Sequence, residues 1–341
     1  MFKRVNVIAN SEWRMANMSR ILFLAQFAPE NDVMLTPPIN SEELFYAETY
    51  HLKIIESLNR LGYNFFPTSN TNHLVEKYYD YDLVWSLYNR LGFRNSEIFV
   101  QSLCEYYSLK YIGAAPNIRA LIEDKSMSKQ LAQHLGIRTA KWCVASKQYP
   151  LSELSQFPGP YFVKPRFGSA SLGIDESCVC DTWKEAIAKS EEYYTNCTEI
   201  LVEEFIEGVY FGVPIVNTID NKPIVAIPHY QRSSKDGGVI TYSQKRFVEA
   251  GMTRHICCDE YLNKVLTYTA NQYFVQIQPC DYARIDFLVD NKSGIPYFLE
   301  VNALMNLGVR SGFVESFLHE HFETYDDLIR HIVELGIAKL N

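Results

Sequence analysis

The sequence predicts an α/β protein with more than one lobe, and three observations support this prediction. Its 341 residues are enough for two or three lobes, each with its own hydrophobic core. Apolar strand-like runs alternate with helix-like segments over roughly the first 115 residues, a pattern typical of an open parallel sheet. Residues 282–302 then form two apolar arms around an Asp-Asn-Lys-Ser-Gly turn, which indicates a β-hairpin.

The composition is that of a folded protein. Hydrophobic residues make up 47% of the sequence and charged residues 21%, which excludes a wholly disordered chain. The net charge of −8 argues against a nucleic-acid or membrane partner. No apolar stretch has the ~20 residues of a membrane span and no signal-peptide core is found, so a cytoplasmic protein is expected. The eight cysteines form no C-x-x-C pair, which indicates neither a zinc site nor a disulfide framework.

The first lobe is expected to span residues 18–116, after an N-terminal appendage of residues 1–17. Residues 21–27, ILFLAQF, form a continuous apolar run that is typical of a buried parallel strand. Ser41 is suited to cap a helix that ends at Gly62. Further strands and helices are expected at residues 65–66, 82–87, 98–106 and 110–112. This alternation predicts an open parallel α/β lobe.

The second expected lobe, residues 117–198, begins with a helix and contains a small-residue loop. The helix, over residues 124–135, places Lys125 and Lys129 on one face, and lysines at this spacing are typical of a solvated face. Residues 161–174 indicate a strand that ends at Lys164, followed by a Gly- and Ser-rich loop whose backbone N–H groups can hold phosphate. The loop lacks the G-x-x-x-x-G-K-[ST] spacing of a P-loop, and a plain turn is the alternative interpretation.

The third expected lobe, residues 199–341, contains the hairpin. Residues 231–247 are polar, and a loop of this length inside a domain is typical of a lid or of a disordered segment. The other expected elements are strands at 199–206 and 210–216, a helix at 259–274 and a helical tail at 316–340.

Four polar side chains interrupt the apolar arms of the hairpin. Arg284 and Asp286 are two residues apart on one arm, so they share a face of that strand. Glu300 and Asn302 do the same on the other arm. Asp286, Glu300 and Asn302 offer the oxygen ligands that Mg²⁺ prefers. Arg284 beside them can hold a phosphoryl oxygen or a developing oxyanion. A solvated polar face is the alternative, but it does not explain why charged residues interrupt strongly apolar runs.

The order R-x-D followed by E-x-N resembles the metal-binding end of ATP-grasp enzymes, and its setting is similar to that in D-alanine:D-alanine ligases. A helix with D-K-x-x-x-K, a loop with K-P-x-x-G-S-x-S-x-G and a strand ending in V-E-E-F-I-x-G precede it in the family's order. The resemblance covers about residues 18 to 340. It implies a three-lobed ATP-grasp fold, with ATP between the second and third lobes. It also implies Mg²⁺, for which Mn²⁺ can substitute, on the nucleotide phosphates.

The resemblance assigns nucleotide contacts by position. Glu203 would accept a hydrogen bond from the adenine amino group, and the backbone after the aromatic residue, at Phe205 and Ile206, would contact the ring. Tyr210 stands where the family has a glutamate that binds the ribose. The residues expected to contact the nucleotide phosphates are Lys125, Lys164, Ser171 and Lys245. The residues expected to be catalytic are Arg284, Lys245 and Ser171.

The resemblance also assigns the amino-acid site, where this sequence departs from the family. Glu43 falls at the place of the glutamate that holds the first amino acid's ammonium group. Asn306 replaces a glycine of the oxyanion site, and Ser311 keeps the place of a serine that binds carboxylate. Ser41 and Ser311 are equally suited to cap helices.

These departures favour an ATP-dependent ligase of specialised metabolism. Such an enzyme phosphorylates a carboxylate or an enolised ketone, couples it to the amine of an amino acid, and releases ADP and phosphate. The alternatives are a mycosporine-glycine:amino acid ligase that forms an imine, a D-alanine:D-alanine ligase of cell-wall synthesis, and an ATP-grasp small-molecule kinase. The expected partners are small molecules including an amino acid, and a second copy of the chain in a homodimer.

Overall fold

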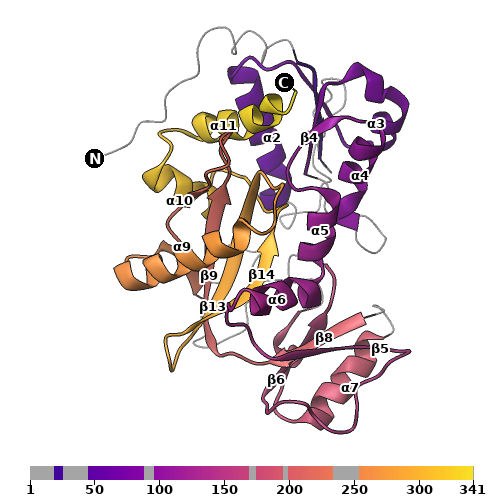
Figure 1. Ribbon diagram of the computed structural model, residues 1–341, viewed down its shortest axis with the longest axis vertical. Helices are drawn as coiled ribbons and strands as arrows, with labels where there is room; N and C mark the ends of the chain where they lie inside the picture. The colour runs from indigo at the N-terminus through magenta and orange to yellow at the C-terminus, as the bar shows by residue number, and fades with distance from the viewer. Residues whose placement is uncertain are drawn as a thin grey trace.

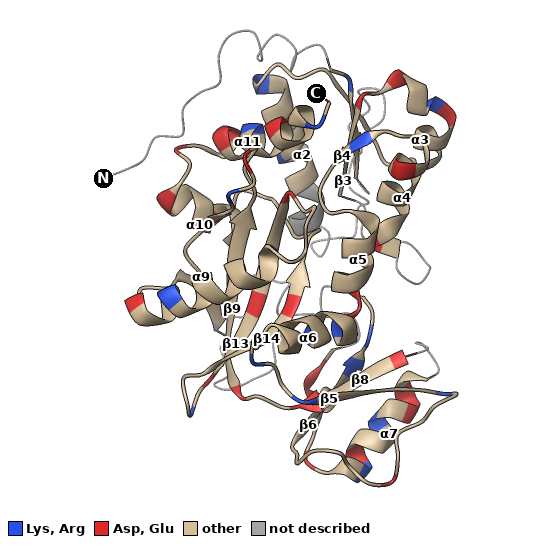
Figure 2. Cartoon of the chain, in the orientation of Figure 1, with Lys and Arg blue, Asp and Glu red and all other residues tan. Residues whose placement is uncertain are grey.

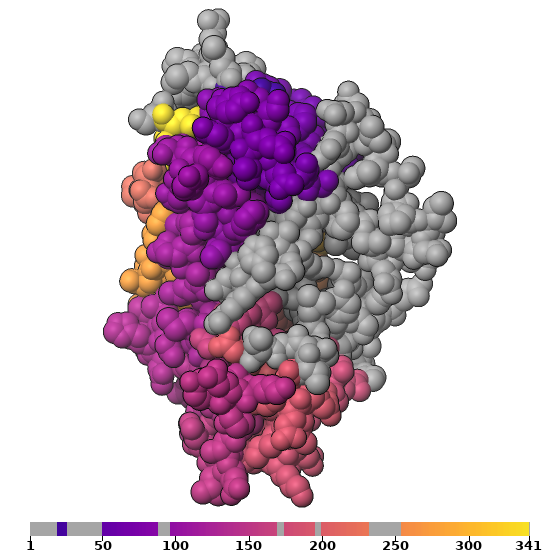
Figure 3. Space-filling view, turned by 90° about the vertical axis from the view of Figure 1, so that its right-hand side faces the viewer, coloured from indigo at the N-terminus to yellow at the C-terminus, as the bar shows by residue number. Residues whose placement is uncertain are grey.

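The computed structural model describes residues 19–25, 45–87, 96–168, 174–194, 199–232 and 253–340. Three sheets form three lobes that follow one another along the long axis of the molecule (Figure 1). The described residues of the N-terminal lobe lie toward one end of this axis, and the small third sheet lies at the other (Figure 3). The mixed α/β class and the parallel N-terminal lobe that the sequence predicts are confirmed.

The N-terminal lobe is built on a parallel sheet in the order β2-β1-β3-β4. Its central strand β1 has no exposed surface along its length, as expected for the run ILFL. The strands are β1 (Ile21–Leu24), β2 (Phe65–Thr68), β3 (Leu83–Ser86) and β4 (Lys110–Ile112). The helices are α2 (Phe45–Arg60), α3 (Asn72–Lys77) and α4 (Phe99–Tyr106), with short 3₁₀ turns η1 (Tyr78–Asp80) and η2 (Ser96–Ile98).

The C-terminal end of the chain returns to this first lobe. The tail forms two helices, α10 (Gly312–Glu320) and α11 (Tyr325–Ala338), rather than the one continuous helical segment that was expected. The break occurs because Thr324 caps a new helix, accepting from the N–H of Asp327 at 3.2 Å. Buried residues of α11 share a hydrophobic core with β1, α2 and β3.

A six-stranded antiparallel sheet forms the centre of the molecule, in the order β12-β11-β9-β13-β14 with β10 beside β9. The predicted hairpin is confirmed as β13 paired with β14, and Gly294 in its turn has φ +67°. Helix α9 packs against the apolar face of this sheet. The elements are β9 (Gly208–Val216), β10 (Ile224–Val225), β11 (His229–Arg232), β12 (Thr253–Ile256), α9 (Glu260–Phe274), β13 (Tyr282–Asp290) and β14 (Pro296–Asn302).

A four-stranded antiparallel sheet, β5-β8-β6-β7, forms a separate small lobe, and helix α7 covers one face of this sheet. Strand β8 lies between β5 and β6, so a boundary drawn by sheet membership falls after residue 204 and not at residue 198. The elements are β5 (Trp142–Ser146), β6 (Tyr161–Pro165), η3 (Glu176–Cys178), β7 (Val179–Cys180), α7 (Trp183–Tyr193) and β8 (Glu199–Glu204).

Two helices join the first lobe to the other two. They are α5 (Pro116–Glu123) and α6 (Lys125–His134). Both contact β14 of the central sheet, and α6 also contacts β5 of the small sheet. In Figure 2 the basic positions of α6 lie beside acidic positions on strands of the central sheet. No helix in the described ranges is both long and apolar enough to cross a lipid bilayer.

Replacing Gly336 by Val should destabilise the chain. Gly336 lies where α11 packs on the N-terminal sheet, and a Cβ atom there would lie 2.4 Å from Cγ1 of Ile112 and 2.9 Å from Cδ2 of Leu83. Overpacking of this kind costs about 1–3 kcal/mol. We expect a lower midpoint of thermal unfolding by calorimetry. The control Ala338→Val, at a half-buried position of the same helix, should unfold close to the unmodified protein, and equal midpoints for both variants would contradict this packing.

Candidate active site

One face of the central sheet carries the polar side chains of the hairpin. Asp286 lies opposite Glu300 on β14 and opposite Gly212 on β9, whose other neighbour is His229 on β11. Opposed residues of neighbouring strands share a face, so these residues form one row. Gly212 is needed in this row because a Cβ atom there would lie 2.7 Å from the His229 ring and 2.9 Å from Cδ of Arg284.

Asp286 is the buried centre of this face. Arg284 binds its carboxylate through Nε at 2.7 Å and Nη2 at 2.8 Å. Asn302 donates to the same carboxylate at 2.8 Å, and the phenol of Tyr210 hydrogen-bonds to it as well. Burial raises the pKa of Asp286, and the Arg284 guanidinium opposes that shift. A solvated polar face therefore does not describe the hairpin, because Asp286 has no exposed surface.

The donor set of this face fits a divalent cation with oxygen ligands. Nδ2 of Asn302 lies 2.8 Å from Oδ2 of Asp286 and 3.4 Å from Oε1 of Glu300, so one hydrogen-bond donor stands between two carboxylates. A cation would take that position once the Asn302 amide presents its oxygen. Mg²⁺ uses one or two carboxylates together with substrate phosphates. In the part of the chain that the structure describes, no group of three or more His, Cys, Asp or Glu residues forms a metal site, so phosphate oxygens would have to complete the shell.

The start of α6 positions Lys125. Asp124 caps the helix by accepting from N–H groups of its first turn, and Arg166 binds the same carboxylate at 2.8 and 2.6 Å. Arg166 also forms an ion pair with Glu199 of β8 at 3.0 Å. Nζ of Lys125 then donates to the carbonyl of Gly168, at the start of the small-residue loop, at 2.6 Å. The helix cap and the strand end before this loop are thereby held together.

A second buried charge cluster lies one turn further along α6. Nζ of Lys129 lies 2.9 Å from Oε2 of Glu203, and Nζ of Lys164 lies 2.5 Å from Oε1. The exposed fractions are 1% for Lys129, 3% for Lys164 and 4% for Glu203. Burial alone would raise the pKa of Glu203, but the two ammonium groups outweigh it and lower that pKa to about 2. The alternative of a solvated face does not describe Lys125 and Lys129, which are 7% and 1% exposed, because the small sheet packs against α6.

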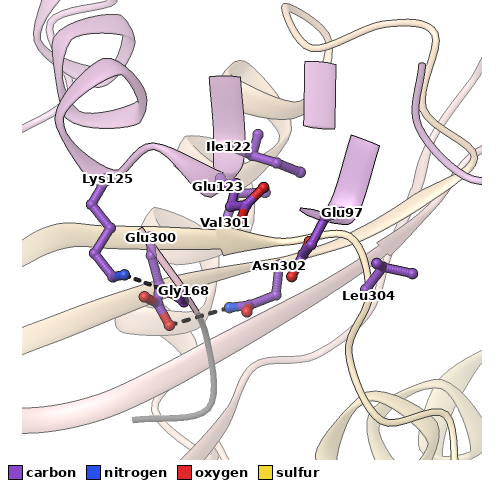
Figure 4. A pocket seen from close by; sticks show the side chains of 9 residues that line it. All are labelled: Glu97, Ile122, Glu123, Lys125, Gly168, Glu300, Val301, Asn302 and Leu304. Carbon is purple, nitrogen blue, oxygen red and sulfur yellow. Dashed lines mark hydrogen bonds between the residues drawn. The ribbon is translucent and has the colours of Figure 1, made fainter. Parts of the chain in front are cut away.

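A small polar cavity lies between the start of the small-residue loop and the hairpin. Figure 4 shows Lys125, Gly168, Glu300 and Asn302 around it, with the Glu300 carboxylate between Lys125 and Asn302 in this view. Glu97 also extends toward it, and burial raises the pKa of Glu97 to about 7. Burial lowers the pKa of Lys125 to about 8, against the opposing effect of Glu300. The complete lining is Glu97, Ile122, Glu123, Lys125, Gly168, Glu300, Val301, Asn302 and Leu304.

The remaining expected site residues lie at the edges of this arrangement. Phe205 follows β8, its ring stacks on Phe162 at 6.2 Å, and its backbone N–H donates to Pro160. Ser311 caps α10 by accepting from Val314 at 3.2 Å, which is the helix-cap alternative. Ile206 follows Phe205, and Asn306 is an exposed residue that accepts from the N–H of Gly308 at 2.6 Å. The expected residues outside the described ranges are Glu43, Ser171 and Lys245, together with nearly all of the lid loop 231–247.

Several residues that shape the site were not predicted. Arg166 lies directly beside a quoted motif residue, and Asp124 is the first residue of the quoted D-K-x-x-x-K motif but was given no role; their opposite charges were the available signal. Lys129 had its helical spacing from Lys125 as a signal. Glu97 belongs to no motif, and only the packing of η2 against α5 brings it to the cavity. Tyr210 was singled out as a departure at the ribose position, but it contacts Asp286 on the polar face instead.

Comparison with known proteins identifies the family. The family model described as "D-ala D-ala ligase C-terminus" matches residues 125–334, which is more than half of the chain. D-alanine–D-alanine ligase A of Clostridium perfringens is 27% identical over 293 residues, covering 83% of this chain and 91% of that protein. A D-alanine–D-alanine ligase of Legionella pneumophila is 28% identical over 260 residues, covering 71% of this chain and 69% of that protein.

Solved structures agree on the fold. The crystal structure of D-alanine–D-alanine ligase from Bacillus anthracis complexed with ATP has a TM-score of 0.72 at 20% identity, covering 94% of this chain and 98% of that one. The VanG D-Ala:D-Ser ligase of Enterococcus faecalis has a TM-score of 0.68 at 16% identity, covering 93% and 99%. The fold is therefore that of the ATP-grasp ligases. The chain belongs to the D-alanine:D-alanine ligase family and is an ATP-grasp ligase that forms a carbon–nitrogen bond.

Proposed function

We propose that this enzyme joins two D-alanine molecules, as the curated relatives' names state for those proteins, rather than serving specialised metabolism. The observation that carries the proposal is the single cavity that Lys125, Gly168, Glu300 and Asn302 line together. The cavity places Lys125, which is suited to bind phosphate, near Glu300 and Asn302, which are suited to bind a cation. The relatives favour the cell-wall alternative over the ligase of specialised metabolism. The family resemblance also supports a homodimer, which we include in the proposal.

The proposed reaction has two steps. A carboxylate oxygen of the first D-alanine attacks the terminal phosphorus of ATP, the bond to the β-phosphate bridging oxygen breaks, and ADP leaves. The acyl phosphate formed is a better acyl donor than a carboxylate. The amino group of the second D-alanine attacks its carbonyl carbon, loses a proton, and displaces inorganic phosphate. One C–N bond forms for each ATP converted to ADP and phosphate.

Lys125 and Lys164 are proposed to hold the nucleotide phosphates. Nζ of Lys125 donates to Gly168 at the start of the small-residue loop, and Lys164 lies near the end of β6, the strand that leads into this loop. Glu203 is proposed to accept from the adenine amino group. The N–H of Phe205 already donates to Pro160, so the backbone of Ile206 is the better candidate for the ring nitrogens. Ser171 and Lys245 keep their proposed phosphate roles on the basis of the resemblance.

Asp286, Glu300 and Asn302 are proposed to hold Mg²⁺, for which Mn²⁺ can substitute. The cation would supply positive charge to the phosphate oxygens. Arg284 is proposed to stabilise the oxygen of the tetrahedral intermediate, because Asp286 holds its guanidinium in a fixed position. The amino-acid contacts proposed from the resemblance are Glu43 for the first ammonium group, Asn306 near the oxyanion, and Ser311 for the second carboxylate.

Replacing Glu300 by Gln should lower turnover at least about 100-fold, because the variant loses a negative ligand for the proposed cation. The measurement is ADP release with ATP, Mg²⁺ and D-alanine, with the dipeptide product quantified by mass spectrometry. The control Glu153→Gln changes an exposed acid of the small lobe, between β5 and β6, and should retain wild-type turnover.

Three outcomes of the same assay would contradict the proposal. Turnover that requires mycosporine-glycine plus an amino acid would establish the ligase of specialised metabolism instead. ADP release that needs only a hydroxyl-bearing substrate would establish a kinase. Unchanged turnover of Glu300→Gln would contradict the cation site.

The rate at limiting ATP should fall at alkaline pH. Burial lowers the pKa of Lys125 to about 8 in the free enzyme, so its phosphate-binding charge is present below this pH and lost above it. We expect kcat/KM for ATP to fall by up to about tenfold per pH unit above that pKa. Lys125→Arg stays charged throughout, so this limb should shift out of the measured range. An identical alkaline limb in both proteins would assign the titration to another group.

A further inference from the structure

Lys129 is a buried cation to which the proposed reaction gives no task. Its side chain is 1% exposed, and its ammonium group lies 2.9 Å from Glu203 and 5.5 Å from the centre of the Trp142 ring. Burying an ammonium group is costly unless it is paired. Burial lowers the pKa of Lys129, and Glu203 opposes this shift. The ion pair with Glu203 is therefore what allows Lys129 to be charged at this position.

Glu203 is held from two sides by different elements. On the small sheet it lies opposite Trp142 of β5 and Phe162 of β6, and Lys164 extends to it along β6. Lys129 reaches it from α6. Each carboxylate oxygen therefore has its own lysine, Oε1 with Lys164 and Oε2 with Lys129.

The two lysines differ in their position relative to the small-residue loop. Lys164 is the second-last residue of β6, at the start of the small-residue loop, where the proposed phosphates bind. Lys129 lies inside a helix whose first turn is fixed by the cap at Asp124 and by a hydrogen bond from Trp142 to Ser126 at 3.0 Å. When Lys164 turns to phosphate, Lys129 is the cation that stays.

We propose that Lys129 determines nucleobase specificity: it keeps Glu203 as an ionised, correctly oriented carboxylate, so that the site accepts a 6-amino purine nucleotide and rejects a 6-oxo purine nucleotide. An ionised carboxylate only accepts hydrogen bonds, so it pairs with an exocyclic amino group and repels a carbonyl oxygen. Without Lys129, a buried Glu203 whose second lysine has turned away favours its neutral form, whose O–H can donate to a 6-oxo group. The inference rests on the proposed function, in which Glu203 faces the adenine.

The test compares binding of ATP and ITP, which differ at the purine 6-position, to the full-length protein with Mg²⁺ by titration calorimetry without any amino acid. The wild-type protein should bind ATP at least about 100-fold more tightly than ITP, since an unpaired buried acceptor discriminates strongly. Lys129→Met should reduce this ratio at least tenfold, and Lys129→Arg, which keeps the cation, should retain it within about threefold. A ratio in Lys129→Met equal to that of the wild-type protein would overturn the inference.

A second comparison covers the case that Lys129→Met does not fold. Glu203→Gln carries both a donor and an acceptor, so its ATP/ITP ratio should be near one. Adding Lys129→Met to Glu203→Gln should leave this ratio unchanged if Lys129 acts through Glu203, and a further change would overturn the inference. Equal binding of ATP and ITP by the wild-type protein contradicts the inference alone. Absence of nucleotide binding contradicts the proposed function itself.

Discussion

Compensation of buried carboxylates by fixed cations is the constraint on which this site depends. Asp286 has no exposed surface and is held by Arg284, and Glu203 is 4% exposed and held by two lysines. Removing one partner of such a pair leaves an uncompensated charge and costs about 3–5 kcal/mol. Two other features serve this compensation. Gly212 leaves room for Arg284 beside Asp286, and the capped helix α6 carries the Lys129 that pairs with Glu203.

Helix α6 connects the parts of the molecule that have to act together. Its capped first turn is linked through Arg166 to the small sheet, and Lys125 lies beside the cavity that Glu300 borders. One turn later along α6, Lys129 forms an ion pair with Glu203 of the small sheet. Because a helix fixes the separation of residues four apart, Lys125 beside the cavity and Lys129 beside Glu203 are held at one spacing.

Much of this architecture was predictable because local sequence and tertiary environment agree. The run at β1, the hairpin and the capped α6 each carry a pattern that predicts the element observed, and the ordered motifs predict the family whose model matches residues 125–334. The rest required tertiary packing. Nothing local distinguishes a solvated lysine from Lys129, whose burial depends on the distant sheet that covers it. The apolar face of the tail is continuous and predicts one helical segment. The cap at Thr324 is the local signal for the break between α10 and α11.

The proposed reaction passes through an acyl phosphate in a site that binds ATP and a cation together. The most direct test supplies D-alanine labelled with ¹⁸O in its carboxylate and analyses the phosphate released with ADP by mass spectrometry. The account predicts that each released phosphate carries one oxygen from the carboxylate, because that oxygen bonds to phosphorus before the amine displaces it. Released phosphate without the label, at the same rate of dipeptide formation, would contradict it.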